Sequence, residues 1–202
     1  MAQIMNEKNS VAWFKLAELV ARREKERALD IYRLLSHSLP NPAYAAKLEA
    51  EVLAVFNDSK AIDSYMRAAQ IYELQENFIQ AFYIYELISF FERQEDCFQK
   101  MLELHQRAYP TITFQEAGSH VLKKWCMRKL YKQALQSVFG LSLDMNVRLA
   151  WIELILADAQ RALAFEEYQK LISLCHSEAS CVKTHDVSIL YKSLQSMKNL
   201  EL

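Results

Sequence analysis

The sequence predicts an all-α protein, and three observations support that class. Only two glycines and three prolines occur among 202 residues, which leaves little of the turn chemistry that β-hairpins and sandwiches require. Strong helix formers such as Ala, Leu, Glu and Lys dominate instead, and their propensities add up over long windows. Apolar residues recur at intervals of three and four, as in Ile62, Tyr65, Met66 and Ala69. We therefore expect amphipathic helices that each bury one stripe.

Length and composition indicate a compact globular chain. Hydrophobic residues make up 52% of the sequence and charged residues 24%, which is enough apolar surface for one core or one continuous helical stack. The formal net charge of -1 gives no general attraction to nucleic acid or to anionic membranes. No stretch approaches the roughly 20 apolar residues that span a bilayer. We expect a cytoplasmic protein that does not insert into membranes and whose four cysteines are reduced.

Capping residues mark where helices begin. Asn41 followed by Pro42 combines an N-cap residue with a first-turn proline. Thr113 and Glu116 have the spacing of a capping box, in which a hydroxyl and a carboxylate each satisfy a free amide of the other residue. Two aspartates are expected to cap further helices: Asp58 and Asp144. These marks divide the chain into about ten or eleven helices joined by short connections, so that sequential neighbours are antiparallel.

The short connections predict a single domain over residues 1–202, because none of them is long enough to act as a flexible tether. The stretch from Pro110 to Thr113, near the middle of the chain, is the best candidate for a change of stacking direction.

Two helices within residues 62–88 carry a specific pattern. Small Ala69 and Ala81 allow two antiparallel helices to approach closely, while large Tyr72 and Tyr85 fill the space around that contact. This alternation of small and large residues resembles the tetratricopeptide repeat. The resemblance implies antiparallel helix pairs that are stacked as a right-handed superhelix.

Weaker copies of the pattern cover three further stretches: 13–40, 122–138 and 151–174. An extra helix from Ala43 to Phe56 must lie between the first copy and the clear one, because they start about fifty residues apart and the family's period is roughly 34. The stretch from Ala68 to Ala81 also resembles the soluble attachment proteins of vesicle fusion. That second resemblance implies a vesicle-fusion adaptor as an alternative function.

The tetratricopeptide resemblance implies a non-enzymatic adaptor or chaperone-like scaffold. In such stacks the first helix of each pair lines a groove that holds a peptide or helix of a partner protein. The corresponding positions here are Phe14, Glu18, Asp63, Met66, Gln70 and Glu73. Apolar and acidic side chains at these positions favour an apolar or basic partner segment. Phe14 and Met66 should be exposed, whereas Trp13 and Tyr72 should be buried in the stack.

The sequence contains no enzyme signature. Two isolated glycines cannot form a phosphate-binding loop, and the G-x-S-x-G and H-E-x-x-H patterns are absent. Cys175, His176, Cys181 and His185 have the chemistry of zinc ligands, but their spacing matches no standard finger. Cys175 also continues an apolar stripe, which favours a core position. We expect no catalytic residue, no cofactor and no metal.

Charge is unevenly distributed along the chain. Residues 117–143 include no acid, and three cations are predicted to share one stripe of a helix over residues 121–132: Lys124, Arg128 and Lys132. This basic helix suggests, as a further alternative, a nucleic-acid or regulatory binder. Trp125 and Tyr131 fall where the repeat pattern places core residues, so an acidic protein is favoured over nucleic acid as the partner.

Overall fold

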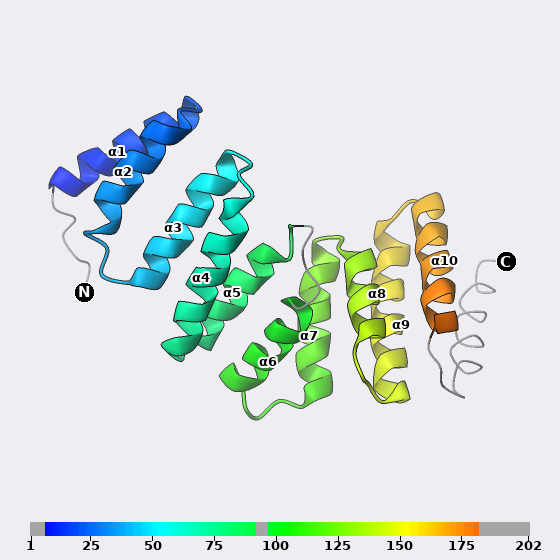
Figure 1. Cartoon of the computed structure of the whole chain (residues 1–202). Coiled ribbons are helices and arrows are strands. Elements are labelled where there is room, and N and C mark those ends of the chain that lie inside the picture. Colours follow the sequence, from blue (N-terminus) through cyan, green and yellow to red (C-terminus); the bar gives the residue numbers. More distant parts are fainter. Residues whose placement is uncertain (1–6, 92–96, 182–202) are drawn as a thin grey trace. The chain divides into compact units, whose positions relative to one another are not determined.

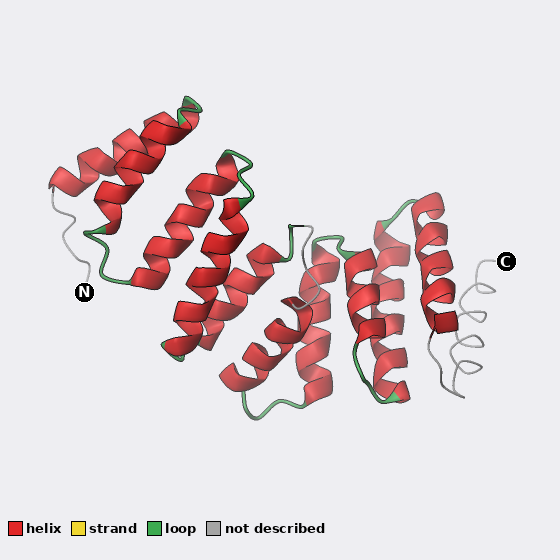
Figure 2. Cartoon of the chain, viewed as in Figure 1, coloured by secondary structure: helices red, strands yellow, loops and turns green. Residues whose placement is uncertain are grey.

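A computed structural model describes residues 7–91 and 97–181 of the chain (Figure 1). These residues form ten α-helices and no strand, which confirms the predicted all-α class (Figure 2). The helices are α1 (Glu7–Ala21), α2 (Lys25–Ser36), α3 (Pro42–Val55), α4 (Lys60–Leu74), α5 (Phe78–Ile88), α6 (Cys97–Ala108), α7 (Phe114–Met127), α8 (Tyr131–Gly140), α9 (Met145–Ala162) and α10 (Phe165–Cys181). Among the described helices, none has the length and apolar content needed to cross a membrane.

The helices group into two compact units, Met1–Ala108 and Tyr109–Leu202. In the first unit each helix packs against the next one along the chain, from α1 to α6. In the second unit α7 packs against α8 and α9, and α10 also packs against α8 and α9. The division falls immediately before the connection from Pro110 to Thr113. A single domain over residues 1–202 and a tetratricopeptide-like superhelix both stay predictions.

The helices begin where capping chemistry predicted. Asn41 Oδ1 accepts the amide of Ala43 at 2.8 Å, and Pro42 is the first residue of α3. At α7 the amide of Glu116 donates to Thr113 Oγ1 at 3.2 Å, and the amide of Thr113 donates to Glu116 Oε2 at 2.8 Å. Both halves of the predicted capping box are therefore present.

The two predicted aspartate caps are also confirmed. Asp58 and Asp144 each accept the amide two residues further on, at 2.9 Å. Asp58 additionally pairs with Lys25 Nζ of α2 at 2.6 Å. The hydrogen bond from Lys25, followed by that from the Lys60 amide, holds the pKa of Asp58 below its usual value. One carboxylate thus caps α4 and ties it to the start of α2.

One turn geometry recurs at equal intervals along the chain. Arg23, Glu76 and Lys129 have positive φ angles of 61°, 56° and 60°, and they are 53 residues apart (23 to 76, and 76 to 129). Each lies two residues after one helix ends and two residues before the next begins. The amide of the next residue closes a Schellman cap by donating to a carbonyl five residues earlier, at about 3 Å. These hydrogen bonds run from the Glu24 amide to the Leu19 carbonyl, from the Asn77 amide to the Tyr72 carbonyl, and from the Leu130 amide to the Trp125 carbonyl. Asn57 makes the same cap after α3, but outside this interval.

The core follows the same interval. Ala28, Ala81 and Ala134 are 53 residues apart on the second helix of each pair, and all three are 0% exposed. Matching positions on the first helix are also buried: Leu19, Tyr72 and Trp125. The chain therefore repeats one helix pair three times, as α1 and α2, α4 and α5, and α7 and α8. The interval exceeds the roughly 34 residues of a helix-pair repeat because a third helix follows each pair.

Candidate partner-binding surfaces

The first helix exposes apolar side chains on one face. Phe14 is 79% exposed, and Val11, one turn earlier, is 69% exposed. On the opposite face Leu16 and Leu19 are buried in a core that also contains residues of α2 and α3. Large apolar side chains that neighbour each other on an exposed helix face are typical of contact surfaces. We name Val11 and Phe14 the α1 apolar stripe.

The exposures predicted for four residues hold in part. Phe14 is exposed and Tyr72 is buried, as predicted. Met66 is half-buried rather than exposed, because α4 packs against both α3 and α5. Trp13 is half-buried rather than fully buried, and it packs at the edge of the N-terminal core.

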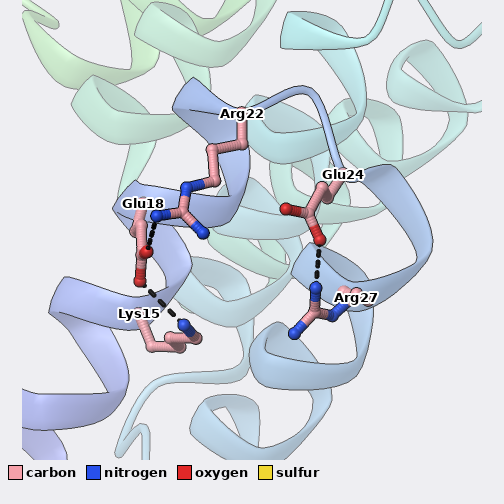
Figure 3. A network of polar contacts seen from close by, with 5 residues as sticks. All are labelled: Lys15, Glu18, Arg22, Glu24 and Arg27. Atoms are coloured by element: carbon pink, nitrogen blue, oxygen red, sulfur yellow. Dashed lines mark hydrogen bonds and ion pairs between the residues drawn. The ribbon is translucent and has the colours of Figure 1, made fainter.

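Glu18 is held by cations of its own helix. Its carboxylate pairs with Lys15 Nζ at 2.8 Å and with Arg22 Nη2 at 2.6 Å (Figure 3). The hydrogen bond from Lys15 is the largest cause that keeps the pKa of Glu18 below its usual value, followed by the charge of Arg22. Across the turn Arg27 of α2 pairs with Glu24. Two cations around one carboxylate leave a positive charge beside the α1 apolar stripe.

The predicted residues of α4 differ in their surroundings. Asp63 and Gln70 are exposed. Glu73 accepts a hydrogen bond from Tyr85 Oη of α5 at 2.9 Å and lies 3.8 Å from Lys100 Nζ of α6. Burial, and then the hydrogen bond with Glu73, raise the pKa of Tyr85. The Glu73 carboxylate therefore connects three helices of the first unit.

The structure does not pack the two predicted sets of residues together. The packing partner of α1 is α2, whereas α4 lies against α3 and α5. Phe14 and Glu18 thus belong to one helix surface, and Asp63, Met66 and Gln70 belong to another. Lys15 and Arg22 complete the first surface, and their spacing of three and four from Glu18 is the sequence signal that indicates them.

The basic segment is not one helix, and the prediction of a helix over residues 121–132 is wrong. α7 ends at Met127 and α8 begins at Tyr131. Lys129, with its positive φ, closes the Schellman cap that ends α7. The three cations lie on different elements: Lys124 on α7, Arg128 in the turn and Lys132 on α8.

The aromatic residues of the basic segment belong to the core, as predicted. Trp125 is 0% exposed and Tyr131 is 3% exposed. Tyr131 Oη also donates to Asp158 Oδ2 of α9 at 2.9 Å. Neither ring is available to stack on the bases of a single strand, which is how aromatic residues contribute to nucleic-acid binding.

Cys175 is a core residue, as the apolar stripe predicted. Its side chain is 0% exposed, and burial raises the pKa of its thiol to about 12. The side chain of Cys181 and the whole of His185 lie outside the described residues. Among the residues that are described, no group of three or more His, Cys, Asp or Glu is arranged to hold a metal ion.

No protein-family model, curated protein or solved structure matches the chain.

Proposed function

We propose that the chain is a non-enzymatic adaptor or chaperone-like scaffold that binds a peptide or helix of a partner protein at the α1 apolar stripe. The observation that carries this proposal is the 79% exposure of Phe14 beside an exposed Val11. Full burial of such a side chain stabilises a complex by about 1.5–3 kcal/mol. A few anchors of this kind supply most of the binding energy in many interfaces.

The chemistry of the stripe supports a binding role. Phe14 and Val11 offer contact area without any group that could act as a nucleophile, acid or base. Lys15 and Arg22 pair with Glu18 and flank the stripe with positive charge, which favours acidic side chains at the edge of the partner segment in place of the basic ones expected from Glu18 alone. The exposed residues of α4, Asp63 and Gln70, extend the proposal to a second contact surface on the same unit.

The proposal extends to the cellular compartment of the protein and to a narrower adaptor function. Cys126 and Cys175 are free and buried, which supports a reducing compartment such as the cytoplasm. A vesicle-fusion adaptor would be one form of such a scaffold, and it is supported by the resemblance at Ala68 to Ala81 alone.

The test is capture of a partner by the tagged full-length chain in its source cells, with Phe14→Ser as the variant. Leu34 on α2 is 69% exposed, so Leu34→Ser removes a similar exposed apolar side chain elsewhere and serves as the matched control. We expect Phe14→Ser to abolish capture and Leu34→Ser to retain it, with the melting temperature unchanged in both variants. Equal capture by both variants would contradict the proposal.

A second candidate is binding of an anionic partner at the turn between α7 and α8. Lys123, Lys129 and Lys132 are exposed there, and none of the three forms an ion pair within the described part of the chain. The variant Lys124→Glu with Arg128→Glu lowers the formal charge of residues 123–132 from +5 to +1. Loss of capture in that variant, with capture retained by Phe14→Ser, would favour this second surface.

A further inference from the structure

The 53-residue interval matches each position of α1 with one position of α4. Val11 corresponds to Ser64, and Phe14 corresponds to Arg67. On α4 both positions contact the preceding helix, α3. Ser64 is 4% exposed, and its Oγ donates to Glu49 Oε2 of α3 at 3.1 Å. Arg67 pairs with the same Glu49 carboxylate.

The matching face of α1 has no such neighbour within the described residues. The packing partner of α1 is α2, whereas α4 packs against α3 on one side and α5 on the other. Val11 is accordingly 69% exposed, where Ser64 is 4% exposed. Phe14 and its counterpart Arg67, whose side chain is 56% exposed, both lie at the open edge of the face. Interior helices of a repeat stack bury this face against a neighbouring helix, and a face of this kind that no helix covers is normally polar.

The residues on this face of α1 differ from those of α4 in a consistent way. Where α4 has a serine and an arginine that bind a carboxylate, α1 has the apolar Val11 and Phe14. Where α4 has the fully buried Ala68, α1 has Lys15, which belongs to the cationic group around Glu18. The face of α1 thus lacks the groups that hold Glu49 on α4, and it presents two apolar side chains with a cation beside them.

We infer that an amphipathic helix of a partner protein packs on α1 in the place that α3 takes on α4, with an apolar residue where α3 has Glu49. An acidic residue of that helix lies opposite Lys15. Because α3 and α4 are sequential helices joined by a short turn, the partner helix runs antiparallel to α1. This inference depends on the proposed function and adds the partner's conformation, its position and its chemistry.

The α3 sequence itself provides the probe. A labelled synthetic peptide of residues 41–57 carries either the native Glu49 or the change Glu49→Leu, and each is titrated with the full chain by fluorescence anisotropy. The host variant is Val11→Ser with Phe14→Arg, which gives α1 the residues of α4. Both positions are exposed, so the host variant should keep the melting temperature of the native chain.

We expect the native chain to bind the Glu49→Leu peptide at least tenfold more tightly than the native peptide. The host variant should reverse this preference, because it replaces an apolar contact with one that binds a carboxylate. Equal affinity for the two peptides, no binding of either, or an unchanged preference in the host variant would each overturn the inference.

A second copy of the chain is the rival occupant, and sedimentation velocity separates it from a partner helix. A native dimer that the host variant converts to a monomer would show that the face pairs with itself, which contradicts the inference. If neither peptide binds but partner capture still depends on Phe14, the inferred partner helix is wrong and the proposed adaptor function stands. If neither peptide binds and partner capture does not depend on Phe14, the proposed function is wrong as well.

Discussion

The indole ring of Trp151 lies directly against the backbone of Gly118. A methyl group added at Gly118 would come within 1.8 Å of the Cζ2 atom of the ring. Trp151 is 0% exposed, its Nε1 donates to the Gln115 carbonyl at 3.3 Å, and the Phe114 ring centroid lies 5.6 Å away. The absence of a side chain at position 118 therefore sets how closely α7 and α9 approach in the second unit.

We expect Gly118→Ala to lower the free energy of unfolding by about 1–3 kcal/mol, because the added methyl overpacks a rigid core contact. Gly140→Ala is the control, since no atom lies within 4 Å of a methyl placed there. Alanine should leave that site neutral or stabilise it by about 0.5–1 kcal/mol. Urea denaturation followed by circular dichroism measures both changes. Equal unfolding midpoints for the two variants would contradict this packing.

The repeat interval predicts equal sensitivity at three alanines. Ala28→Leu, Ala81→Leu and Ala134→Leu should each destabilise by about 1–3 kcal/mol, because all three positions are fully buried at the same place on the second helix of a pair. Ala157 is exposed on α9, so Ala157→Leu should change stability by no more than about 0.5 kcal/mol. If Ala81→Leu left the denaturation midpoint unchanged, the helix-pair repeat would be wrong.

The carboxylates of Asp58 and Glu116, which cap α4 and α7, should make the folding stability depend on pH. Bonds to Lys25 and the Lys60 amide lower the pKa of Asp58 from 3.8, and bonds within the capping box lower the pKa of Glu116 from 4.5. A lowered folded-state pKa contributes stability above the unfolded pKa, and this stability is lost as pH falls through the folded value. We expect Asp58→Asn and Glu116→Gln to lower the melting temperature at pH 7 but not at pH 2. The same decrease at both pH values would show that charge is not involved.

The buried thiols should resist alkylation in the folded protein. Burial raises the pKa of Cys126 and of Cys175 to about 12, so the thiolate form is scarce at pH 8. We expect iodoacetamide to leave both residues unmodified in the native chain and to modify both in urea, as measured by peptide mass spectrometry. Rapid labelling of native Cys175 would contradict its core position and reopen its role as a metal ligand.

Local chemistry explains which parts of the fold the sequence could predict. The caps at Asn41, Thr113 and Asp144 depend on residues that are two or three apart, so their patterns are sufficient. The small residues Ala69 and Ala81 are both fully buried, as their repeat positions indicated. The interval of 53 residues is visible in Ala28, Ala81 and Ala134, but a template with a period near 34 does not find it.

The incorrect prediction of one helix over residues 121–132 has a specific cause. Helices commonly end with glycine in the left-handed conformation, and here Lys129 takes that position instead. The sequence therefore contained no recognisable stop signal, and the spacing of the cations continued across the turn. Glu73 illustrates a different limit, because its contacts with Tyr85 and Lys100 come from other helices and leave no mark in local sequence.

The central claim is that a partner binds at the exposed side chain of Phe14, and site-specific photo-cross-linking tests it most directly. A benzophenone amino acid is placed at position 14, at the similarly exposed control position 34, or at position 132 on α8 beside the basic turn, and cells expressing each chain are irradiated. We predict one protein adduct from position 14 that is absent from positions 34 and 132. The same adduct from position 132 with none from position 14 would contradict the account.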